Sequence, residues 1–125
     1  MKLVERAVGE VVVLTVTGDV SLNGQGDTQL REKVADFLKE GHRKLVLDLG
    51  GVTYMDSAGL GQLVYAQTST KGAGATLKVA NPTVRLRQLL AVSKITSLFD
   101  IHDSETAALA SFGVTEAPSP GAGST

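Results

Sequence analysis

Apolar residues follow two different spacings along this chain of 125 residues. Residues 2–8 and 11–17 are rich in β-branched side chains, which favour strands, and Gly9–Glu10 separates them. A two-residue loop with glycine first is typical of a type II′ turn. Beyond this predicted hairpin, short apolar runs alternate with segments in which apolar residues recur every three or four positions, the spacing of one helix face.

The first helical segment is expected to follow a loop at residues 18–26, which holds three glycines. Asp27 or Thr28 is expected to cap this helix, and Gly41 to end it, because glycine suits the position just after a helix. The apolar stripe of the helix consists of Leu30, Val34, Phe37 and Leu38.

The central segment begins with an apolar run at 45–49, which has the length of a buried strand. Gly50–Gly51 are expected to break that strand. Asp56 then occupies the position of a helix N-cap, so Ser57 is predicted to be the first helical residue. Apolar residues continue at helical spacing until residues 71–74, which close the helix.

The C-terminal half repeats the pattern. Residues 76–80 alternate as a strand does, and Asn81–Pro82 is predicted to start a helix, with asparagine as cap and proline as first residue. A short strand is expected at 97–101. Ser104 is predicted to cap a last helix at 105–112.

Strands that alternate with helices predict an α/β fold with crossover connections and a mostly parallel sheet. The opening hairpin makes this sheet mixed, and four helices are expected to pack on it. Residues 1–113 are predicted to form one domain. Residues 114–125, rich in proline, glycine and serine, are expected to be a disordered tail.

Composition narrows the function classes. The net charge of −1 comes without a long charged run, which argues against nucleic acid or direct membrane contact. The chain has no cysteine, so disulfides and thiolate metal sites are excluded, and a cytoplasmic location fits. The apolar stretch 11–16 is too short for a signal sequence or a membrane span. No group of His, Asp and Glu has metal-ligand spacing.

Ser57 is the candidate for chemistry. Its hydroxyl is expected beside unpaired backbone N–H groups at the positive end of a helix dipole, a place that stabilises phosphate. Ala58, Gly59 and Gly61 are small, and two glycines in one helical turn indicate that something approaches the backbone closely. The alternative is a plain capping pair with small residues that permit tight packing on the sheet.

An enzyme is a poorer fit. The nucleophile elbow of hydrolases needs Gly-x-Ser-x-Gly, and Met55 stands at its first position. A triad needs a histidine, and the two present, His42 and His102, are expected at the surface. Gly24–Gly26 begins like a dinucleotide loop, but Gln29 occupies the third glycine position. No catalytic residue, metal or cofactor is therefore predicted.

Two further groups of residues have alternative interpretations. The basic residues at Lys78, Arg85, Arg87 and Lys94 are either a solvated helix face or a rim that docks a partner. Tyr54 and Met55 are either core residues or interface contacts beside Ser57.

The segment 54–61, YMDSAGLG, closely resembles the signature of bacterial anti-sigma factor antagonists of the STAS domain family. The order of elements over residues 3–113 is also similar to the family fold. The resemblance implies that a partner kinase phosphorylates Ser57. It further implies a partner-binding surface that consists of Asp19, Ser21, Tyr54, Met55, Asp56, Ser57, Ala58, Gly59 and Leu60.

The function implied by the resemblance is partner switching in a bacterial signal-transduction circuit. The unphosphorylated protein would bind an anti-sigma factor that is also a serine kinase with an ATP-binding fold, which would release a sigma factor. Phosphorylation of Ser57 would abolish this binding, and a metal-dependent serine phosphatase would restore it. The alternative is a non-catalytic STAS subunit of a lipid-transport complex or sensor assembly.

The sequence departs from the family after the second predicted strand and at Lys94, where many members have glycine. Members often have Gly-Glu-Leu-Asp after the second strand, whereas this chain has GDVS at residues 18–21. Ser21 therefore replaces an acidic residue that lies near the phosphorylated serine in the family. Either recognition by the kinase or phosphatase is altered, or Asp19 compensates.

Overall fold

The computed structural model describes residues 1–21 and 29–115. Five strands form one mixed sheet in the order β1-β2-β3-β4-β5, in which β1 and β2 are antiparallel and the other neighbours are parallel. The strands are β1 (Lys2–Val8), β2 (Val11–Val20), β3 (Lys44–Met55), β4 (Thr76–Ala80) and β5 (Asp100–His102). The helices are α1 (Gln29–Lys39), α2 (Ser57–Gly72), α3 (Val84–Val92), the 3-10 turn η1 (Thr96–Leu98) and α4 (Glu105–Ser111).

The predicted α/β fold class is confirmed: the hairpin leads into a mostly parallel sheet, and four α-helices lie within the described residues. Gly9 has φ +59, as the first loop position of a type II′ turn requires. Leu30, Val34 and Phe37 of the predicted stripe are buried, and Gly41 has φ +93 after α1. The predicted caps at Asp27 or Thr28 lie outside the described residues.

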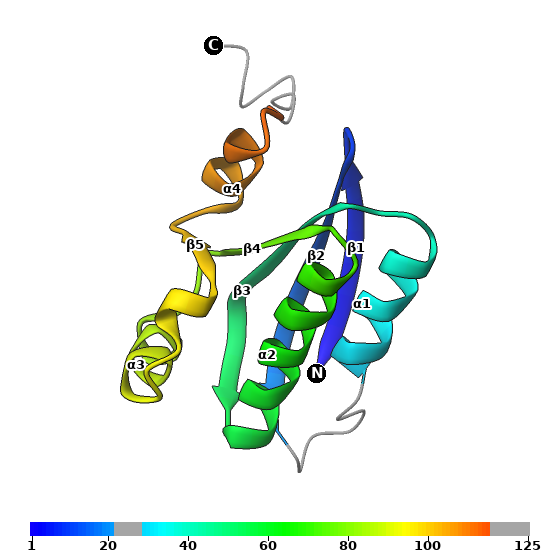
Figure 1. Ribbon diagram of the computed structural model, residues 1–125. Coiled ribbons are helices and arrows are strands. Elements are labelled where there is room, and N and C mark those ends of the chain that lie inside the picture. The colour runs from blue at the N-terminus through cyan, green and yellow to red at the C-terminus, as the bar shows by residue number, and fades with distance from the viewer. Residues whose placement is uncertain (22–28, 116–125) are drawn as a thin grey trace.

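The two faces of the sheet carry separate cores. On one face, α1 and α2 lie side by side (Figure 1) and α3 packs next to them. That larger core contains alternate residues of the central strands, among them Leu14, Leu47 and Val79. The opposite face is covered by α4, whose Ala108 and Leu109 pack with the strand residues Val8, Val11, Val13, Val46 and Ala80.

The prediction that Gly50–Gly51 break the third strand is wrong, because β3 continues through both to Met55. Neighbouring residues leave no room for a side chain at either glycine. A β-carbon at Gly51 would lie 2.5 Å from Thr17 Cγ2, and one at Gly50 would lie 2.1 Å from Asn81 Nδ2. The longer β3 pairs with β2, which runs on to Val20 instead of ending at residue 17.

The predicted helix start at Asn81–Pro82 is also wrong. Asn81 has φ +56 and its N–H donates to the carbonyl of His102, 2.9 Å away, so it belongs to the connection between β4 and α3. Thr83 is the N-cap of α3, and its Oγ1 accepts a hydrogen bond from Leu86 N at 3.1 Å. This threonine cap, two residues later than predicted, satisfies a backbone N–H that the first turn of α3 leaves without a carbonyl partner.

The end of the described chain agrees in part with expectation. The strand expected at 97–101 is instead η1 followed by β5. Ser104 caps α4 as predicted, since its Oγ accepts from Ala107 N at 3.0 Å. Val114 still packs on the smaller core, so the packed chain reaches one residue past the predicted domain end. Residues 116–125, most of the predicted tail, lie outside the described ranges.

Among residues 1–21 and 29–115, no helix has both the length and the apolar character needed to cross a membrane.

Candidate functional site

Ser57 is the first residue of α2, and its side chain is exposed. The preceding residue, Asp56, is extended (φ −105, ψ −172) and its Oδ1 accepts a hydrogen bond from Gly59 N at 2.9 Å. The Asp56 carbonyl accepts from Leu60 N at 2.8 Å, which closes the first helical turn. The predicted N-cap and the predicted helix start are thus both confirmed.

This geometry would stabilise a phosphate group attached to the Ser57 hydroxyl. The helical pattern leaves the N–H groups of Ser57 and Ala58 without carbonyl partners, and they face the same end as the positive pole of the helix dipole. The helix has 16 residues, so the dipole is well developed. A phosphate on Ser57 would gain about 0.3–1 kcal/mol from this environment at an exposed position.

The two glycines near the start of α2 have different surroundings. A β-carbon at Gly59 would lie 1.8 Å from the carbonyl oxygen of Val20, so the helix rests directly on the end of β2. Among residues 1–21 and 29–115, nothing lies within 4 Å of the corresponding position at Gly61, which is exposed. At Gly59, the close approach expected from the sequence is therefore a contact with the protein's own backbone. At Gly61, the surface near Ser57 is open.

The sheet brings the other predicted residues to this edge. Asp19 pairs with Tyr54 and Val20 pairs with Met55, so the ends of β2 and β3 lie together below the start of α2. Asp19 and Tyr54 are exposed, the latter with 49% of its surface.

Three of the predicted contact residues are buried. Ser21 is only 3% exposed, and its Oγ has no hydrogen-bond partner within the described chain. Leu60 is 9% exposed as part of the larger core, and Gly59 is buried against Val20. These three residues support the site from the protein interior. The residues that a partner can reach are the exposed Asp19, Tyr54 and Ser57 and the half-buried Met55, Asp56 and Ala58.

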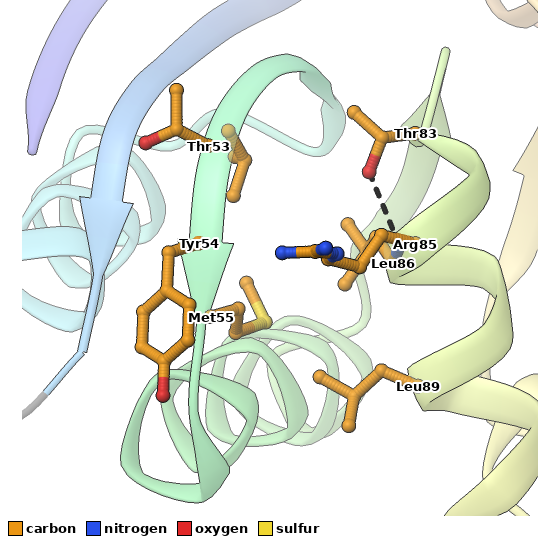
Figure 2. A pocket seen from close by; sticks show the side chains of 8 residues that line it. Thr53, Tyr54, Met55, Thr83, Arg85, Leu86 and Leu89 are labelled. Atoms are coloured by element: carbon orange, nitrogen blue, oxygen red, sulfur yellow. Dashed lines mark hydrogen bonds between the residues drawn. The ribbon is translucent and has the colours of Figure 1, made fainter.

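A pocket of about 220 Å³ opens between the end of β3 and α3 (Figure 2). In Figure 2, the Arg85 side chain reaches from α3 towards β3, beside Met55, whereas Tyr54 lies on the far side of the strand. The lining consists of Val52, Thr53, Tyr54, Met55, Thr83, Arg85, Leu86 and Leu89. The pocket therefore shares two residues with the predicted partner surface.

The four basic residues singled out in the sequence do not form one surface. Lys78 pairs with Asp100 at 3.0 Å, and Arg87 pairs with Asp103 at 2.7 Å. Lys94 follows α3 with φ +60. Arg85 alone of the four lines the pocket. The sequence could not single it out, because α3 comes beside β3 only in the folded chain.

A catalytic role for Ser57 lacks its base in the part of the chain that is described. His42 stands just before β3, at the opposite end of that strand from Ser57. His102 lies on β5, and its Nε2 lies 2.9 Å from the Asp100 carboxylate. Neither imidazole is placed to take the Ser57 proton.

A family model described as "Mlab, STAS domain" matches residues 3–100. The chain belongs to the STAS domain family. A Bordetella bronchiseptica protein provisionally named as an anti-sigma factor antagonist, BtrV, is 28% identical over 112 residues, which cover 90% of this chain and 95% of BtrV. The resemblance seen in residues 54–61 is thereby confirmed at the level of the family.

Solved structures agree on the STAS fold. A crystal structure from Thermotoga maritima, TM1081, also provisionally named an anti-sigma factor antagonist, has a TM-score of 0.79 at 21% identity. The match covers 87% of this chain and 92% of TM1081. The phosphorylated form of the Bacillus cell fate determinant SpoIIAA has a TM-score of 0.69 at 18% identity, with 89% of this chain and 99% of SpoIIAA covered.

Proposed function

We propose that this STAS domain is an anti-sigma factor antagonist that acts by partner switching, with Ser57 as the phosphorylated residue. The unphosphorylated protein binds an anti-sigma factor that is also a serine kinase, and the phosphorylated protein does not. The observation that carries the proposal is the exposed Ser57 hydroxyl at a capped helix start, at the edge where Asp19, Tyr54 and Met55 gather. The names of BtrV and TM1081 support it.

The physics of the site separates folding from binding. A phosphoserine carries about −1.5 to −2 charges at pH 7. On the free protein this charge lies at an exposed position at the N-terminus of α2, beside N–H groups that have no carbonyl partner within the helix, so the fold tolerates it. Across a docked interface the same charge must lose its water or meet the partner's groups, which weakens the complex.

The neutral residue at position 21 is compatible with this proposal. Ser21 is buried, so it offers the partner almost no surface. Asp19 is exposed and lies opposite Tyr54 in the register of β2 and β3. Family members often have two acidic residues in this segment. We assign to Asp19, the one acidic residue here, the contact with the partner.

The first test is whether a kinase modifies Ser57. Intact-mass analysis after incubation with ATP and the candidate serine kinase should show one added phosphate on wild type and none on Ser57→Ala. A phosphate on the alanine variant would place the modification elsewhere. The alternative function, a non-catalytic STAS subunit of a transport or sensor assembly, predicts no phosphate on either protein.

The second test is binding. Ser57→Glu should weaken kinase binding at least tenfold, about 1.4 kcal/mol, while its melting temperature stays close to that of wild type. Thr68→Glu is the matched control, because Thr68 is exposed on the same helix about 16 Å further along. Equal affinities for the two glutamate variants in isothermal titration would contradict the switch.

A further inference from the structure

We propose that the pocket between β3 and α3 is an anchor site for an acidic side chain of the partner kinase, and that Arg85 is its recognition residue. This inference rests on the proposed function and extends it to the chemistry of the partner. The pocket adjoins the Ser57 site through Tyr54 and Met55, which line it.

Charge is the first argument. Arg85 is the one charged residue among the eight that line the pocket. Its side chain is exposed, and no carboxylate within residues 1–21 and 29–115 pairs with it, although Lys78 and Arg87 nearby in sequence both have aspartate partners. A guanidinium binds a carboxylate with two parallel hydrogen bonds. An incoming carboxylate would therefore be bound without the loss of an existing ion pair.

Size is the second argument. A volume of about 220 Å³ is below the range of about 300–1,000 Å³ that is typical of pockets for cofactors and drug-sized ligands. It suits one or two amino-acid side chains of a partner. The walls include the aliphatic chains of Val52, Leu86 and Leu89, which would pack against the stem of a glutamate or a neighbouring apolar residue of the partner.

The residue types are the third argument. Tyrosine, methionine and arginine are enriched in the cores of protein–protein interfaces, and tyrosine and arginine are frequent hot spots. Met55 and Arg85 lie beside one another at this pocket, and Tyr54, whose ring lies on the far side of β3, exposes 49% of its surface. A lone surface arginine would be unremarkable, but this combination beside the phosphorylation site favours a protein partner over a small ion.

The anchor also strengthens the proposed switch. Met55 lines the pocket and stands two residues before Ser57, so their Cα atoms are at most about 7 Å apart. The Debye length at physiological ionic strength is about 8 Å. A phosphate on Ser57 is thus close enough to the rim of the pocket to repel an acidic side chain that enters it.

The test compares two variants that each remove one positive charge from α3. Arg85→Gln should weaken binding of the purified kinase that phosphorylates Ser57 by at least tenfold in isothermal titration. Arg87→Gln should change it less than twofold, because Arg87 lies outside the pocket and its pair with Asp103 is exposed. Arg85→Lys should recover part of the affinity, and the affinity of Arg85→Gln should depend less on salt than that of wild type. Melting curves check that all three variants fold.

Each outcome has a defined meaning. If Ser57→Glu weakens binding but Arg85→Gln behaves like Arg87→Gln, the anchor proposal fails and the switch stands. If wild type neither binds a kinase nor is phosphorylated, both proposals fall. Sedimentation of each variant examines a second copy of this chain as the occupant: self-association that is lost in Arg85→Gln, with unchanged kinase affinity, would overturn the assignment to the kinase.

Discussion

The carbonyl oxygen of Val20 lies where the β-carbon of any residue other than glycine at position 59 would have to be, with 1.8 Å between the two. The first turn of α2 therefore rests on the backbone at the end of β2. Backbone yields less readily than the tip of a side chain. This contact fixes the position of Ser57 relative to the ends of β2 and β3.

Gly59→Ala should destabilise the protein by roughly 1–3 kcal/mol, the range for overpacking, although alanine is the better helix former. Gly61→Ala is the matched control, because it changes the next glycine of the same helix at a position with no atom of the described residues within 4 Å. That control should stabilise the protein by about 0.4–1 kcal/mol. Urea denaturation measures both. Equal midpoints would show that the Val20 contact relaxes freely.

Gly61 also bears on partner binding. Its open surface lies one helical turn after Ser57, so a partner that covers Ser57 should approach the backbone at Gly61. We expect Gly61→Ala to weaken kinase binding while it stabilises the fold. Gly72→Ala is the control, since Gly72 is also open but ends the same helix far from Ser57. If both variants bind as wild type does, the interface does not reach Gly61.

Asp56→Ala should lower the free energy of unfolding by about 0.5–2 kcal/mol through loss of the N-cap bond to Gly59 N. It should also slow phosphorylation, because the cap helps to fix the position of Ser57. Asp56→Asn keeps an oxygen acceptor and should retain most of the stability. Denaturation midpoints and the initial rate of phosphate transfer are the measurements. An alanine variant as stable as wild type would contradict the role of the cap.

Features set by near neighbours in the chain were predictable from the sequence. The II′ turn at Gly9 and the caps at Asp56 and Ser104 each depend on groups within three residues. The buried stripe of α1 follows from helical periodicity, and the alternation of elements led to the correct fold class. The resemblance of residues 54–61 then pointed to the correct family.

Features set by distant parts of the chain were not predictable. Gly50 and Gly51 appeared to be strand breakers, but they make room for Asn81 and Thr17 across the sheet. Asn81 appeared to be a helix cap, but it is held by the His102 carbonyl of β5. The position of Arg85 beside Met55 and the burial of Ser21 likewise depend on tertiary packing, which periodicity does not report.

The last prediction concerns Glu105, at the start of the helix that covers the second face of the sheet. A hydrogen bond shared with the Asp48 carboxyl and partial burial both raise the pKa of Glu105, and Arg6, 2.6 Å away, opposes them without cancelling the rise. In the folded protein Glu105 therefore holds its proton to a higher pH than in the unfolded chain, where its pKa is near 4.5.

The sign of the pH effect follows. Because the folded state binds the proton more tightly, this group favours folding most at low pH, and its contribution is lost as pH rises from about 4.5 through the folded pKa. Glu105→Gln should remove that dependence. The stability of wild type minus that of the variant should thus fall between pH 4 and pH 7, measured by denaturation at each pH. Asp48→Asn keeps an acceptor for Gly50 N but removes the carboxylate that raises the pKa of Glu105. The stability of Asp48→Asn should therefore change less with pH than that of wild type. A difference between wild type and Glu105→Gln that stays constant or grows with pH would show that the ion pair with Arg6 outweighs the contact with Asp48.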